Sequence, residues 1–182
     1  MRARKVKGLD PATPLGDNAE RIVRVRLDEL CSFMPQAADA GEVTALHDMR
    51  IAAKRLRYIL EITQPCFGPY AESAVKTVKE LQDLLGDIHD CDVQLPEVRA
   101  FLDELVIADA GALLDGAPEP PNRDAYAGLV ALSADLLARR DRQFAEFLDL
   151  WRGLERKGFR ARLEYAICER PGANGRATIG RP

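Results

Sequence analysis

The sequence is poor in aromatic residues and histidine, and it has no long hydrophobic run. Only 6% of the residues are aromatic, and the two histidines are His47 and His89. No apolar stretch approaches the ~20 residues that a membrane-spanning helix requires. The N-terminus is basic, but it lacks the apolar core of a signal peptide. These absences predict a protein that does not enter a membrane and resides in the cytoplasm.

An excess of positive charge is also missing. The chain has 26 lysines and arginines against 29 aspartates and glutamates, which gives a net charge of −3. A protein that binds nucleic acid over its whole surface is normally basic, so an anion site here must be a local patch. The four cysteines form no CxxC pair, which favours free thiols in a reducing compartment.

Motifs of nucleophilic catalysis are absent as well. The sequence has no GxSxG motif, no glycine-rich phosphate loop, and no cysteine with a histidine close by in sequence. Nucleophilic catalysis therefore has no support in the sequence, and with no cofactor motif either we expect no cofactor.

Helical periodicity is what the sequence does have, and no stretch alternates with a period of two. A first helix is predicted from Asp17 to Met34, where Pro35 stops it, and a second from about residue 41 to Gln64. The fold class is therefore predicted to be all-α, most simply an antiparallel four-helix bundle with short extra helices.

The second half of the chain continues the helical pattern. A third helix begins near Pro69, and Pro96 should kink or restart it. Glycine and proline predict a loop over residues 110–122, before a long helix that starts at Arg123 and breaks near Gly158. The predicted organisation is a flexible basic arm over 1–16, a helical domain over 17–168 and a disordered tail over 169–182.

A stripe of cations on the second predicted helix organises the rest of the chain. It consists of His47, Arg50, Lys54 and Arg57, spaced so that they fall within ~80° around the helix. Apolar residues cover the opposite side, which predicts a core-facing surface with a basic stripe behind it. A solvated helix face usually mixes charges of both signs. A polyanion would relieve the repulsion within this stripe, although a merely solvated basic surface is the simpler alternative.

Two other interpretations remain open from the residues alone. The dipeptide His-Asp occurs at His47-Asp48 and at His89-Asp90, as in helical metal-dependent phosphohydrolases. Asp48 points about 100° away from His47 around the helix, and the cationic surroundings disfavour a divalent metal. The second interpretation is a helical protein-interaction module without a small ligand, which requires only the amphipathic pattern.

Two sequence segments resemble the CHAD family, the conserved-histidine α-helical domain. The first is LHDMRIAAKRLRYILE, and the second, about twenty residues later, is LQDLLGDIHDCDV. With its amphipathic flanks, the resemblance covers roughly residues 17–157. The matching residues of the first segment are His47, Arg50, Lys54, Arg55, Leu56 and Arg57. Those of the second segment are Leu81, Gln82, Leu85, Gly86, Asp90 and Asp92.

The resemblance implies a helical-bundle fold that binds inorganic polyphosphate through its basic residues and does not catalyse a reaction. Longer members carry the signature twice, in two bundles around a basic cavity, whereas this sequence shows one copy. The late segment FRARLEY at residues 159–165 is too weak to count as a second. We therefore expect that two chains pair as an isologous homodimer to rebuild the double bundle.

The resemblance and the stripe together assign roles to six residues. Arg50 and Arg57 should bind phosphate oxygens in a bidentate manner, and Lys54 and Lys79 should neutralise neighbouring phosphates. His47 should donate a hydrogen bond, so that binding tightens as the imidazole gains a proton in mild acid. The sixth residue, Arg55, lies at the margin of the stripe.

Arg55 could instead contact the acidic turn around Asp90. Leu81, Gln82 and Gly86 are interpreted as packing and helix-contact residues. A second tier of binding candidates comprises Lys76, His89, Arg139 and Arg142.

Nucleic acid is the competing polyanion. The net negative charge and the lack of aromatic residues for base stacking near the stripe argue against it. The sequence therefore favours polyphosphate over nucleic acid as the partner.

Overall fold

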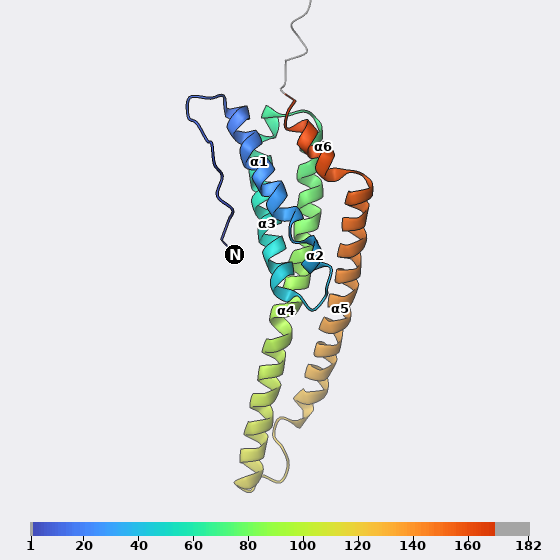
Figure 1. Ribbon diagram of the computed structural model, residues 1–182. Coiled ribbons are helices and arrows are strands. Elements are labelled where there is room, and N and C mark those ends of the chain that lie inside the picture. Colours follow the sequence, from blue (N-terminus) through green and yellow to red (C-terminus); the bar gives the residue numbers. More distant parts are fainter. Residues whose placement is uncertain (1, 170–182) are drawn as a thin grey trace, which may run out of the picture.

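The structure is a computed structural model that describes residues 2–169, and all regular structure in this range is helical (Figure 1). The all-α prediction is confirmed. No helix in the described range is both long and apolar enough to cross a membrane. The helices are α1 (Leu15–Cys31), α2 (Met34–Ala37), α3 (Val43–Thr63), the 3-10 turn η1 (Gln64–Cys66), α4 (Tyr70–Leu114), α5 (Arg123–Arg156) and α6 (Phe159–Ala166).

Helix boundaries follow the proline and glycine signals except in three places: the end of the first helix, Pro96, and the loop after α4. The first helix ends at Cys31, and Pro35 lies inside the separate short helix α2. The break near Gly158 is confirmed, because this residue adopts a left-handed conformation with φ of +63° between α5 and α6.

Pro96 was predicted to kink or restart the third helix, and the restart is excluded because α4 runs through this residue without interruption. Proline removes one backbone hydrogen bond and crowds the preceding turn. Pro96 is exposed, so its ring lies on the solvent side, while Leu95 and Val98 beside it are partly buried. Packing on α5 thus holds the helix together across the proline. The loop predicted over 110–122 is likewise shorter, since α4 ends only at Leu114.

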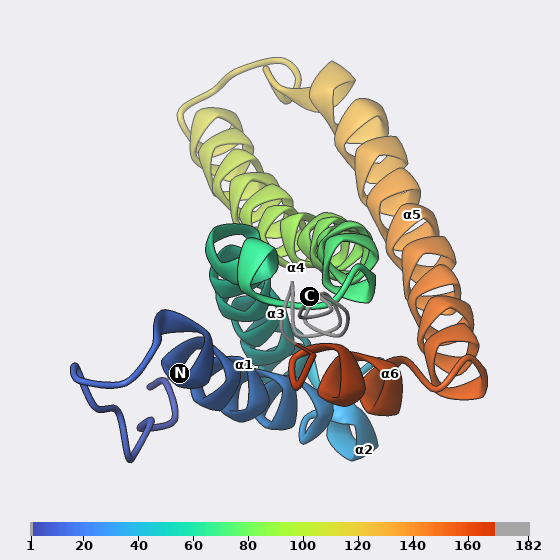
Figure 2. The ribbon, with the colours of Figure 1, turned by 90° about the horizontal axis from the view of Figure 1, so that it is seen from above.

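One end of the molecule is a well-packed helical bundle. Seen from above, α3 lies between α1 and α4, and α6 lies beside α1, between it and the end of α5 (Figure 2). Leu27, Met49, Leu56, Leu81 and Leu163 come from these four helices, and all are fully buried in one hydrophobic cluster. This core fixes the rotation of α3, so that its basic stripe faces away from α1.

The other end is a hairpin that projects beyond the bundle. There α4 and α5 run side by side with no third helix against them (Figure 1). Asp109 closes the tip, accepting hydrogen bonds from the Asn122 backbone N–H at 3.0 Å, the Asn122 side-chain amide at 2.7 Å and the Tyr126 hydroxyl at 2.6 Å. The molecule is therefore more elongated than a single four-helix bundle.

The N-terminal arm contacts α1. The Arg4 backbone N–H donates to Glu29 Oε1 at 3.1 Å, and its guanidinium donates to Ser32 Oγ at 2.6 Å. Arg21 donates to the Gly8 carbonyl at 2.8 Å. The arm thus lies along α1 with several of its polar groups engaged. The predicted disordered tail over 169–182 falls outside the described residues, except for Glu169.

Candidate functional site

The basic stripe of α3 faces α4 along an antiparallel contact. Two pairs of residues fix the register of the two helices. Nδ1 of His47 lies 3.3 Å from Nδ1 of His89. One turn further, a Cβ atom added to Gly86 would lie 3.5 Å from Nε of Arg50. Three residues forward on α3 thus correspond to three residues back on α4.

Continuing this register brings the remaining cations together. Lys54 falls opposite Gln82, and Arg57 falls opposite Lys79, since both helices rise 1.5 Å per residue. Lys79 also lies within about 20° of Gly86 around α4, on the exposed side of the contact. We call this set the basic seam. It comprises His47, Arg50, Lys54 and Arg57 on α3, with Lys79, Gln82, Gly86 and His89 on α4.

Polar atoms in the basic seam are buried without hydrogen-bond partners among the described residues. They are Nε of Arg50, Nε of Arg57 and Oε1 of Gln82. Nε of Arg57 does lie 3.4 Å from Glu61 Oε1 in an ion pair, but the N–H makes no hydrogen bond there. Buried polar groups are normally satisfied. The seam therefore holds two arginine N–H donors that a bound acceptor could satisfy.

The histidine pair can hold only one proton between its facing nitrogens. Their ring centroids are 4.5 Å apart, and a hydrogen bond needs one Nδ1 as donor and the other as acceptor. Burial lowers the pKa of His89, and the positive charges of His47 and Arg50 lower it further. The lowered pKa of His89 disfavours the protonated ring in the free protein, whereas a bound anion would favour it.

An aromatic ring borders the basic seam, contrary to what the sequence suggested. The guanidinium carbon of Arg57 lies 4.6 Å from the centroid of the Tyr58 ring, and Nζ of Lys54 lies 5.8 Å from it. Tyr58 is 44% exposed. One of the two arguments against nucleic acid is weakened, because a base could stack on this ring.

Arg55 points away from the basic seam. Its guanidinium donates to Glu29 Oε1 at 3.1 Å, and Arg26 donates to the other oxygen of the same carboxylate at 2.6 Å. Glu29 is almost fully buried on α1. The contact seen for Arg55 is thus with this buried carboxylate on α1. These contacts favour a structural role for Arg55, which ties α3 to α1.

Of the second-tier candidates, His89 is in direct contact with the stripe. Lys76 is exposed and pairs with Glu72 at 3.4 Å. Arg139 donates to Sγ of Cys91 at 3.4 Å. Cys91 lies about 160° around α4 from His89, so Arg139 is on the far side of that helix. Arg142 is exposed on α5.

Sequence reasoning missed the role of Arg140. Its guanidinium donates to Asp92 Oδ1 at 2.5 Å and to the Ala40 carbonyl at 2.7 Å, and so joins α5 to α4 and to the turn that precedes α3. Asp92 also lines a shallow hollow of about 320 Å³ in front of His47 and His89. Its carboxylate is thereby neutralised beside the histidine pair. No local pattern in the sequence reveals a contact across a hundred residues.

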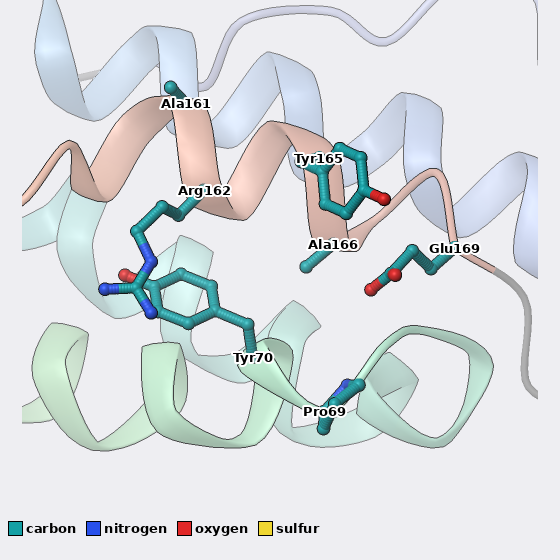
Figure 3. A pocket seen from close by; sticks show the side chains of 7 residues that line it. All are labelled: Pro69, Tyr70, Ala161, Arg162, Tyr165, Ala166 and Glu169. Atoms are coloured by element: carbon teal, nitrogen blue, oxygen red, sulfur yellow. The ribbon is translucent and has the colours of Figure 1, made fainter.

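Another hollow, of about 390 Å³, lies between α6 and the start of α4 (Figure 3). Arg162 stacks on Tyr70 there, with its guanidinium carbon 4.3 Å from the ring centroid, and Glu169 lines the other side. The charges are mixed, so this hollow lacks the cationic character of the basic seam. Among residues 2–169, no group of three or more histidine, cysteine, aspartate or glutamate side chains could hold a metal ion.

The fold and the site are those of a helical-bundle protein whose histidines and cations line the contact between α3 and α4. The family model for the CHAD domain matches residues 2–99, and the chain belongs to this family. The match ends within α4, so it includes the basic seam and leaves out most of the projecting hairpin. No curated protein and no solved structure matched the chain.

Proposed function

We propose that this protein binds inorganic polyphosphate in the basic seam and does not catalyse a reaction. The observation that carries the proposal is the pair of buried arginine N–H groups, at Arg50 and Arg57, that make no hydrogen bond among the described residues. Family membership supports the same ligand class. A linear polyphosphate offers oxygen acceptors at regular intervals, which suits cations repeated every three to four residues along a rigid helix.

The roles follow from the contacts. Arg50 and Arg57 supply directed donors, while the exposed amines of Lys54 and Lys79 add charge on either side of the helix contact. His89 accepts a proton when the anion arrives and turns the histidine pair into a further cation. Arg55 contributes indirectly, because its pairing with Glu29 holds α3 in place.

A calorimetric titration tests the proposal. Long-chain polyphosphate and single-stranded DNA of matched total charge are titrated into the protein at two salt concentrations. We expect polyphosphate to bind more tightly and its affinity to fall as salt rises. Equal or tighter binding of DNA would contradict the proposed ligand, and Tyr58→Ala would then test base stacking. If neither polymer binds, the proposal is wrong and the basic seam is a solvated basic surface.

A further inference from the structure

The projecting hairpin exposes an unusual amount of apolar surface. Of the fifteen large hydrophobic residues that are exposed in the described chain, nine lie between Val93 and Leu137. Large apolar patches on a soluble protein usually mark a contact surface. The tip of the hairpin is held in a defined conformation, because Asp109 accepts three hydrogen bonds there.

The burial pattern shows which exposed residues share a face. Partly or fully buried residues recur on both helices at alternating steps of three and four, as the core positions of a coiled coil do. On α4 these inward positions include Val98, Leu102 and Leu105, and on α5 they include Leu129 and Leu136. In an antiparallel pair of helices, the residues that come directly after the inward residues in sequence face the same side of the pair on both helices. These positions therefore form one continuous surface across the hairpin.

We call this surface the outer hairpin face. Alanines fill the spaces between its large side chains, which allows another helix to approach closely. A hollow of about 480 Å³, lined in part by Arg99 and Leu137, lies on the same side. The large residues of the outer hairpin face are Val106, Leu113, Val130 and Leu137, with Ile107 and Leu114 along its edge, and they are 44–89% exposed.

We propose that the outer hairpin face is the contact surface between two copies of this chain, which pair antiparallel about a two-fold axis. Two stacked hairpins complete a four-helix layer, in which each hairpin covers the apolar face of the other. The six large side chains expose roughly 600 Å² per copy, and the alanines add to this, against the ~800 Å² that each partner contributes to a standard interface.

The charges on this face favour a second copy over a strongly charged partner. The face carries both signs, with Arg99 and Arg123 against Asp103, Asp124 and Asp141. Arg123 lies at the tip and Asp141 at the base, about 27 Å apart along α5. Antiparallel pairing about the middle of the hairpin brings Arg123 of each copy to Asp141 of the other.

This pairing differs from the one that the family resemblance suggested. A shared basic cavity would need contacts beside the basic seam, whereas the outer hairpin face lies on the part of α4 and α5 that projects beyond the bundle. The proposal therefore does not depend on polyphosphate binding, and either can fail without the other.

Sedimentation equilibrium from about 1 to 200 μM tests the pairing. We expect wild-type protein to sediment as a dimer at the upper concentrations. Val106→Glu with Val130→Glu should raise the dimer dissociation constant at least about tenfold, because it places charges in the apolar contact. Both side chains point outward, so circular dichroism should show unchanged helix content. Ile62→Glu is the matched control, because Ile62 is 74% exposed on α3, outside the hairpin, and it should leave the dimer intact.

A charge exchange tests the register. Arg123→Asp should weaken the dimer severalfold, and adding Asp141→Arg to the same chain should restore it, since each copy supplies both partners. A wild-type chain that stays monomeric at 200 μM would overturn the proposal and leave the face to a different protein. A dimer that survives the Val106→Glu and Val130→Glu changes, or one that Ile62→Glu also disrupts, would overturn it as well.

Discussion

The bundle and the hairpin are built from the same amphipathic pattern, yet they differ in burial and in charge. In the bundle, Met49, Leu56 and Leu81 are fully buried among α1, α3, α4 and α6. In the hairpin, each helix has one neighbour, and residues 95–140 hold eight acidic and four basic side chains. A hydrophobic pattern thus predicts a helix in both regions, whereas the number of neighbouring helices decides how much of the apolar surface of that helix is buried.

The largest expected effect contrasts one leucine from each region. Leu56→Ala in the bundle should lower the free energy of unfolding by about 2–5 kcal/mol, because it leaves a cavity in a packed core. Leu132→Ala in the hairpin, where the side chain is 44% exposed, should cost less than about 1 kcal/mol. Urea denaturation of both variants measures the difference. Equal losses would contradict the contrast between the two regions.

The second effect concerns the charges of the basic seam. Arg50→Ala with Arg57→Ala should weaken polyphosphate binding about 30-fold or more, since a hydrogen bond to a charged group contributes about 1.5–3 kcal/mol. Titration calorimetry measures it.

The matched control for the charge change is Arg152→Ala with Arg156→Ala near the end of α5. It removes the same charge from exposed positions away from the basic seam. If both double variants lose affinity equally, net charge alone accounts for binding and the seam is not the site.

The third effect is the pH dependence of the histidine pair. The pKa of His89 is lowered in the folded protein by burial and by the positive charges of His47 and Arg50. The unfolded chain therefore takes up this proton first as the pH falls below about 6.5, and the stability of the free protein should decrease there.

A bound polyanion reverses this preference because it favours the protonated ring. Polyphosphate affinity should therefore rise by severalfold between pH 7.5 and pH 5.5, and His89→Gln should flatten the rise. Titrations at the two pH values measure the change. A strongly acidic polyanion, whose charge is the same at both pH values, is titrated in parallel as a control for the ionisation of phosphate. An equal rise in the variant would assign the pH dependence to other groups.

The smallest expected effect is that of Gly86→Ala, which should change the stability of the protein and its affinity for polyphosphate in opposite directions. An added methyl group would lie 3.5 Å from Nε of Arg50, which is an ordinary contact distance. Gly86→Ala should stabilise the helix by about 0.5–1 kcal/mol and weaken polyphosphate binding about twofold, because the methyl group takes up space beside Nε of Arg50 that a phosphate oxygen would need. Thermal melting and calorimetry on the same variant measure the two changes. A loss of stability would show that α3 and α4 lie closer together at this point.

Local sequence signals were sufficient for much of the fold. The limits of α3 and the start of α5 follow from prolines, glycines and periodicity, and the stripe of His47, Arg50, Lys54 and Arg57 is visible from spacing alone. The uninterrupted helix through Pro96 was not predictable in this way. Packing against α5 outweighs the local preference of proline there, and that neighbour is distant in sequence.

Contacts between helices account for the other differences in the site. The meeting of His47 with His89 depends on the register of α3 against α4, and the pairing of Arg55 with Glu29 depends on the rotation of α1. Spacing within one helix shows which residues share a face. It does not show which residues of another helix that face meets.

Lysine labelling tests the central claim most directly, because the chain has only six lysines. The protein is acetylated with and without long-chain polyphosphate, and the modification rate of each lysine is read by mass spectrometry. We expect polyphosphate to slow the labelling of Lys54 and Lys79 in the basic seam, while Lys157, at the end of α5, reacts at an unchanged rate. Equal protection of all three lysines, or protection of Lys157 alone, would contradict it.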